Sequence, residues 1–230
     1  MLLALDIGNS DVVLGIWDKQ KWIHVWRIPT RPNQPELFYG IKIKDYFFEA
    51  NLSLNHVDKI VLSSVVPDLT DKLRNVIAVL FGKESIVLGP DVYQKLAIKV
   101  LNPYEIGSDL VSNAIAAYDY YQNTCIVVDF GTALTFTTLS SKGEILGVSI
   151  VPGLKTAIKS LTQNTAKLFD VPLAMPASAL GTSTITAIQS GILFGYSGLV
   201  QSMVGEIRSE IKENCPAIAT GGLSSIITPL

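Results

Sequence analysis

The chain opens with short apolar runs separated by polar turns, a pattern that predicts a three-stranded meander. The apolar run at residues 2–5 leads into Asp6-Ile7-Gly8-Asn9-Ser10, and further apolar runs follow at residues 12–17 and 22–28. Runs of this length, bounded by polar or glycine-containing turns, are typical of strands.

The same order of features returns midway along the chain. Residues 125–128 lead into Asp129-Phe130-Gly131-Thr132-Ala133, and apolar runs at residues 134–139 and 144–151 follow around a polar turn. Both copies therefore read as a buried strand, an acid-Gly-hydroxyl/amide turn and two hairpin strands. A unit that occurs twice predicts a duplicated fold.

Apolar residues at helical spacing predict the helices between these strands. In residues 36–50 the spacing is carried by Leu37, Phe38, Ile41 and Phe48, and in residues 68–81 by Leu69, Leu73, Val76, Ile77 and Leu80. Residues 108–121 and 184–211 are also expected to be helical, and residues 59–62 and 217–219 to form short strands. We expect an α/β protein of two related halves, residues 1–114 and 115–230, with a cleft between them.

Composition and charge exclude some classes of function. The chain is 48% hydrophobic and 17% charged, with a net charge of −2 and a pI of about 5.7, whereas a protein that neutralises nucleic-acid phosphates should be basic. Residues 1–6 lack the basic region of a secretory signal, and Cys125 and Cys215 lie far apart, which favours two reduced thiols in a cytoplasmic protein. We therefore expect no nucleic-acid partner.

Residues 171–205 contain no charged side chain, which leaves two interpretations open. An uncharged helix can span a membrane, but polar residues and three glycines, Gly191, Gly195 and Gly198, interrupt this one. A helix that is apolar on most sides also suits a subunit interface. We expect an interface and no membrane.

The two acid-Gly turns suggest phosphate chemistry. Glycine lets an anion approach the backbone closely, and the turn amides favour a negatively charged oxygen. The carboxylates of Asp6 and Asp129 can hold Mg²⁺ through water, and two facing turns could hold the β- and γ-phosphates of ATP. Thr220-Gly221-Gly222 follows a strand and could lie flat against an adenosine. The alternative is that all three are ordinary strand-end turns or loops.

Asp109 is the candidate for the general base that phosphoryl transfer to a hydroxyl needs. It opens a predicted helix with an apolar face at Leu110, Val111, Ala114, Ile115 and Tyr118, and Asn113 lies one turn further on. Asp and Ser are also preferred helix N-caps, so Ser108-Asp109 could serve only as a cap.

Taken in order, these residues resemble the type III pantothenate kinases, which include the Bvg accessory factor proteins. Asp6-Ile7-Gly8-Asn9-Ser10 is similar to the family's first phosphate motif, and Asp129-Phe130-Gly131-Thr132-Ala133-Leu134-Thr135 to its second. Pro103-Tyr104-Glu105-Ile106-Gly107-Ser108-Asp109 resembles its Pro-x-Glu-x-Gly-x-Asp-Arg stretch. Four further matching segments follow in the family's order: Val151-Pro152-Gly153, residues 165–168, residues 181–184 with 189–191, and Thr220-Gly221-Gly222.

The resemblance implies a duplicated ribonuclease H-like fold of the actin/Hsp70/sugar-kinase class, a homodimer, and phosphorylation of pantothenate by ATP as the first step towards coenzyme A. It implies that Asp109 is the base and that Asp6 holds Mg²⁺ through water. Asp129 would help to bind a monovalent cation, K⁺ or NH₄⁺. The residues implied in ATP binding are Asp6, Gly8, Asn9, Ser10, Gly131, Thr132, Ala133, Gly221 and Gly222. Those implied in pantothenate binding are Tyr104, Gly107, Ser108, Asp109 and Thr184, the last reaching into the partner's pocket.

The chain departs from the family at Leu110, where the family has Arg. A charge-assisted hydrogen bond typically contributes about 1.5–3 kcal/mol, so we expect Leu110 to affect the affinity for pantothenate. The sequence also ends soon after Gly222, where the family usually continues through a closing helix. The alternatives to a pantothenate kinase are a kinase or ATPase of the same fold with another substrate, and a catalytically lapsed homologue that binds a nucleotide or small molecule.

Overall fold

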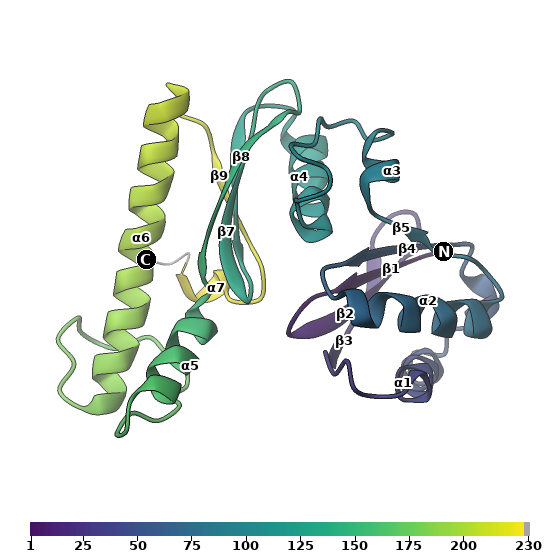
Figure 1. Ribbon diagram of the computed structural model, residues 1–230, viewed down its shortest axis with the longest axis horizontal. Helices are drawn as coiled ribbons and strands as arrows, with labels where there is room; N and C mark the ends of the chain where they lie inside the picture. The colour runs from purple at the N-terminus through teal and green to yellow at the C-terminus, as the bar shows by residue number, and fades with distance from the viewer. Residues whose placement is uncertain (228–230) are drawn as a thin grey trace. The chain divides into compact units, whose positions relative to one another are not determined.

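The computed structural model of the protein describes residues 1–227 and divides them into two compact units (Figure 1). The first unit comprises Met1–Leu96 and Asn102–Asn113. The second comprises Ala97–Leu101 and the chain from Ala114 onward. Each unit is built around one mixed β-sheet. The division into duplicated halves at residues 1–114 and 115–230, which the sequence suggested, remains a proposal.

The first unit has a five-stranded sheet in the order β3-β2-β1-β4-β5. The meander pairs β1 with β2 and β2 with β3 antiparallel, and β4 lies parallel to β1 on its other side. The elements of this unit are β1 (Leu2–Ile7), β2 (Asp11–Trp17), β3 (Trp22–Pro29), α1 (Glu36–Glu49), η1 (Leu54–His56), β4 (Lys59–Ser64), α2 (Pro67–Phe81), β5 (Ile86–Val87), α3 (Pro90–Tyr93) and the start of α4 (Ser108–Tyr121).

Helices α1 and α2 cover the same face of this sheet, because residues of both share one buried cluster with alternate residues of β1 and β4. The predicted helices are confirmed, and so is the buried face of α2. The residues that carried the predicted spacing of α1 are only partly on its buried face. Phe38 packs against the core, but Leu37, Ile41 and Phe48 are exposed. The fully buried side chains are Tyr39, Ile43 and Phe47. An aromatic-rich helix offers several apolar stripes, and the tertiary packing selects one of them.

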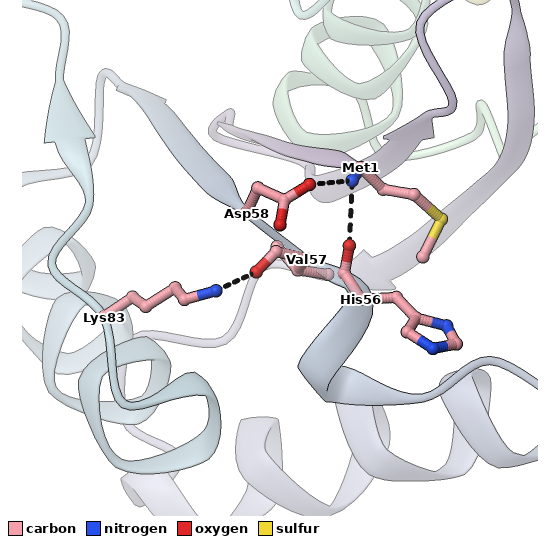
Figure 2. A network of polar contacts seen from close by, with 5 residues as sticks. All are labelled: Met1, His56, Val57, Asp58 and Lys83. Atoms are coloured by element: carbon pink, nitrogen blue, oxygen red, sulfur yellow. Dashed lines mark hydrogen bonds and ion pairs between the residues drawn. The ribbon is translucent and has the colours of Figure 1, made fainter.

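A small polar network fixes the start of β1 to the start of β4 (Figure 2). The ammonium group of Met1 donates to the His56 carbonyl at 2.8 Å and forms an ion pair with Asp58 at 2.6 Å. The Lys83 ammonium donates to the Val57 carbonyl from the segment after α2. These bonds set the register in which Asp6 lies beside Ser63 at the other end of the same strand pair.

The second unit repeats this arrangement with a four-stranded sheet in the order β8-β7-β6-β9. The meander is again antiparallel, and β9 lies parallel to the first strand of the meander, as β4 does in the first unit. The elements are β6 (Cys125–Phe130), β7 (Ala133–Leu139), β8 (Ile145–Pro152), α5 (Leu154–Asn164), α6 (Thr184–Ile211), β9 (Ala217–Thr220) and α7 (Ser224–Ile227). The predicted duplicated α/β architecture is therefore confirmed.

Helices α5 and α6 lie on one side of the second sheet (Figure 1), where they share a buried cluster with β6 and β7. The long helix α6 begins at a capping box formed by Ser183 and Thr186. It carries most of the uncharged segment noted in the sequence. Within residues 1–227 no helix is long and apolar enough to cross a membrane.

Candidate phosphate and catalytic sites

Asp6 occupies the carboxyl end of β1, where it is exposed between two neighbouring strands. Its register partners are Val13 on β2 and Ser63 on β4. In the turn that follows, the Gly8 amide donates to the Asp11 carbonyl at 3.0 Å. The Gly8 amide is therefore used within the turn, whose next two residues, Asn9 and Ser10, are exposed.

Asp129 occupies the same position at the end of β6 in the second unit. Its register partners are Thr135 on β7 and Thr220 on β9, so a hydroxyl-bearing residue lies on each side of the carboxylate. In the following turn, the Gly131 amide donates to the Ala133 carbonyl at 3.1 Å. The two acid-Gly turns thus share their place in the sheet. In each of them the Gly amide donates to the carbonyl of the first residue of the next strand, which is three residues on in the first turn and two in the second.

The turn after Asp129 is contacted by two motifs that are distant in the sequence, those of Gly153 and Gly221. The Thr132 carbonyl accepts hydrogen bonds from the Gly153 amide at 3.0 Å and from the Thr156 hydroxyl at 2.7 Å. Gly221 has a φ of +88°, and a Cβ atom there would lie 2.7 Å from the Phe130 nitrogen and would also strike Oδ1 of Asp129. The Gly-Gly turn therefore passes directly over the Asp129 carboxylate, where only glycine fits.

Asp109 lies in the first turn of α4, within the first unit. The helix starts with a hydrogen bond from the Val111 amide to the Gly107 carbonyl at 3.2 Å, and Oδ1 of Asp109 accepts from the Leu110 amide at 2.8 Å. Burial, and secondarily the negative charge of Asp109, raise the pKa of Tyr93, the last residue of α3. The base candidate is therefore half-buried in the same unit as Asp6.

Ser108 does not cap α4 through its side chain. Its hydroxyl is 4% exposed and bonds to β4: it accepts from the Ser64 amide at 2.9 Å, donates to the Ser64 carbonyl at 3.1 Å, and lies 2.9 Å from the Ser63 hydroxyl. These bonds bring Asp109 to the end of the strand pair that carries Asp6.

Two further candidates for the pantothenate site come from other segments of the chain. Tyr104 is 85% exposed, in the loop before α4. Thr184 is the first residue of α6 and lines an apolar hollow of about 370 Å³ in the second unit, together with Leu161, Leu168 and Gly191.

Comparison with known proteins assigns the chain to a family. The family model described as type III pantothenate kinase matches residues 2–206. The chain belongs to the type III pantothenate kinase family. A type III pantothenate kinase of Citrifermentans bemidjiense is 41% identical over 229 residues, which cover 100% of this chain and 90% of that protein.

Solved structures with low sequence identity to this chain show the fold. A proposed Baf family transcriptional activator of Campylobacter jejuni has a TM-score of 0.57 at 21% identity and covers 99% of this chain and 86% of its own. A proposed 2-dehydro-3-deoxygalactonokinase of Sinorhizobium meliloti has a TM-score of 0.59 at 12% identity. The match covers 100% of this chain and 87% of that protein's chain. The expected actin/Hsp70/sugar-kinase-like fold is therefore confirmed.

In this member of the type III pantothenate kinase family, the oxygen donors suit hard cations. Thr135 is 7% exposed, and its hydroxyl has no hydrogen-bond partner among the described residues, although it lies opposite Asp129. Asp6 is exposed, as a carboxylate that holds Mg²⁺ through water should be. No cluster of three or more His, Cys, Asp or Glu gathers within residues 1–227.

Ser63 was not predicted from the sequence, and Thr135 and Thr220 were named only as members of motifs, not as neighbours of Asp129. Ser63, Thr135 and Thr220 flank the two aspartates only through the strand register, which a sequence without its fold does not reveal. Leu110, which replaces the arginine of the family's pattern, is 7% exposed, as an apolar residue of the helix's buried face should be.

Proposed function

We propose that this protein transfers the γ-phosphoryl group of ATP to the hydroxyl of pantothenate, giving 4'-phosphopantothenate, the first step towards coenzyme A. The observation that carries the proposal is the connection between Asp6 and Asp109. Asp6 is the register neighbour of Ser63, whose hydroxyl bonds to that of Ser108, the residue before Asp109. The acid proposed to hold Mg²⁺ and the base candidate on α4 are thus linked to the same end of one sheet.

Each residue of the proposed site has one role in phosphoryl transfer. The pantothenate hydroxyl oxygen forms a bond to the γ-phosphorus, the bond from that phosphorus to the leaving oxygen of ADP breaks, and the hydroxyl proton passes to the Asp109 carboxylate. The transition state is loose, so positioning and charge stabilisation supply most of the rate. Asn9, Ser10, Thr132 and Ala133 lie in the two turns that would contact the phosphates, and Gly221 and Gly222 would lie against the adenosine.

Two cations complete the proposed site. Mg²⁺ would be held by Asp6 through water and would neutralise phosphate charge, since this ion keeps several waters and takes few carboxylates. K⁺ or NH₄⁺ would be held near Asp129, where the unpartnered hydroxyl of Thr135 supports an oxygen-liganded cation.

A homodimer built on α6 is part of the proposal. Four exposed glycines, Gly191, Gly195, Gly198 and Gly205, follow one face of this helix, and a Cβ atom at any of them would meet nothing within 4 Å. Each glycine costs a helix about 1 kcal/mol relative to alanine, and residues 1–227 of the protomer give no packing reason for that cost. A second helix that approaches the backbone closely would supply the reason. Thr184 begins this face, which suits a contribution to the partner's pantothenate site.

The product identifies the reaction. Incubation of the purified protein with ATP, Mg²⁺, K⁺ and pantothenate should yield phosphopantothenate by mass spectrometry. Product without pantothenate dependence, or transfer to a different hydroxyl compound only, would indicate another kinase of the same fold. We also expect the enzyme to act in the cytoplasm.

A further inference from the structure

The first turn of α4 is attached to strand β4 by a buried group of hydroxyls. Ser108 and Ser63 are 4% and 6% exposed, and their hydroxyl oxygens lie 2.9 Å apart. The Ser108 hydroxyl also bonds to both the amide and the carbonyl of Ser64. A serine hydroxyl has one proton, so when Ser108 donates it to the Ser64 carbonyl, the bond between the two hydroxyls is donated by Ser63.

The group extends to a second helix. The Ser64 hydroxyl accepts from the Thr70 hydroxyl at 2.7 Å and from the Val66 amide at 3.2 Å, and Thr70 lies in the first part of α2. The end of β4 is therefore held from both sides. Ser63 shares the sheet face of Asp6, and Ser64 faces the helices that cover the other side.

An ordinary helix start would not need these bonds. Ser108 is the first residue of α4, after Gly107, whose carbonyl accepts the first helical hydrogen bond, so the helix does not need the serine hydroxyl as a cap. Ser108 instead directs its hydroxyl to a strand 44 residues earlier in the chain. The consequence is positional: the backbone that carries Asp109 cannot shift without breaking bonds to the strand beside Asp6.

We propose that Ser108 is a positioning residue for phosphoryl transfer, which acts by holding Asp109 at a fixed distance from the Asp6 turn, with Ser63 as its side-chain partner. The inference rests on the proposed function. It also changes the role of Ser108 from pantothenate binding to positioning, because a hydroxyl that is buried and makes three hydrogen bonds has little capacity left to bind a substrate.

The test compares Ser108→Ala with Ser112→Ala in steady-state kinetics at a temperature where circular dichroism shows both variants folded. Ser112 is the matched control: it lies one turn further along α4, and its hydroxyl bonds to the Ser108 carbonyl within the same helix. Misplacement of a reacting group by about 1 Å can cost about a hundredfold in rate. We expect kcat of Ser108→Ala to fall by about ten- to a hundredfold while the KM for ATP stays within about twofold, and Ser112→Ala to match wild type.

Ser63→Ala is the milder variant, because it leaves both bonds from Ser108 to the Ser64 backbone in place. It should lower kcat less than Ser108→Ala does, and it keeps the test usable if Ser108→Ala does not fold. A folded Ser108→Ala or Ser63→Ala with wild-type kcat, or an equal loss in Ser112→Ala, would overturn the positioning role. Absence of pantothenate-dependent turnover in the wild type would instead overturn the proposed function and the catalytic role of Ser108 with it.

Discussion

Oδ1 of Asp109 occupies the space that a side chain at Gly107 would need. The next nearest atoms are a methyl carbon of Val65 at 3.4 Å and Cγ of Asp109 itself at 3.5 Å, both ordinary packing distances. The carboxylate thus folds back over a residue without a side chain, in the same turn where the Leu110 amide holds it. Gly107 therefore controls where the base candidate lies.

Gly107→Ala should lower kcat strongly and change stability little. The new methyl group would displace the end of a flexible side chain rather than backbone, so folding is expected to survive, while a displaced base costs about ten- to a hundredfold in rate. Kinetics and thermal melts of the variant check both parts. Gly89→Ala is the control, because a Cβ there meets nothing within 4 Å. A Gly107→Ala enzyme with wild-type kcat would show that the position of the carboxylate does not matter.

Gly221→Ala and Gly222→Ala form a second matched pair, with stability as the measurement. Gly221 has a positive φ, and a Cβ there would lie 2.7 and 2.8 Å from backbone atoms of Phe130. A left-handed conformation alone costs a residue with a side chain about 1–2 kcal/mol, and the backbone clash adds to it. Gly222 has open space for a methyl group. We expect the melting temperature to fall clearly only for Gly221→Ala, and equal melting temperatures would contradict the close packing over Asp129.

The sequence predicted helix α6 but missed helix α5. Helix α6 has a capping-box start at Ser183 and a long apolar run, and its bounds, Thr184–Ile211, are those predicted. Helix α5 was not predicted, although Leu154, Ile158 and Leu161 stand at helical spacing; it is short, mostly polar and has no side-chain cap.

Local sequence motifs predicted only part of the site. Asp6, Asp109 and Asp129 each stand in a recognisable turn or helix start. The hydroxyls of Ser63, Thr135 and Thr220 become neighbours of the aspartates through strand pairing, over distances in sequence that periodicity does not resolve. The surroundings of Ser108 were also beyond the sequence, since the same residue type is expected at a helix cap. Its bonds to β4 depend on tertiary structure.

Gly198→Leu should convert the proposed dimer into monomers. Gly198 lies within the glycine face of α6, and a leucine there would hold a partner helix away from the backbone. Size-exclusion chromatography with light scattering measures the effect, and Asp119→Leu, which adds the same side chain at an exposed position of α4, should leave the mass unchanged. A Gly198→Leu protein that keeps the dimer mass would place the interface elsewhere.

Stability at alkaline pH should depend on Cys125. Burial, with a smaller contribution from Cys215, raises the pKa of the Cys125 thiol to about 11, whereas an unfolded cysteine has a pKa of about 8.5. The unfolded chain therefore loses this proton first, so the contribution to stability is complete below about pH 8.5 and disappears as the pH rises towards 11. The melting temperature of wild type should fall more steeply over this range than that of Cys125→Ala. If the melting temperatures of the two proteins fall in parallel as the pH rises, the buried thiol does not cause the loss of stability at alkaline pH.

The most direct test of the account is an ADP-release assay with ATP, Mg²⁺ and pantothenate, run in potassium and again in sodium, on the wild type and on Asp109→Asn. The account predicts pantothenate-dependent turnover that needs potassium in the wild type, and loss of that turnover in a variant that still folds. Near-normal activity of Asp109→Asn would leave this residue as a helix-start residue only. A folded wild-type protein with no turnover in either salt would contradict the proposed reaction.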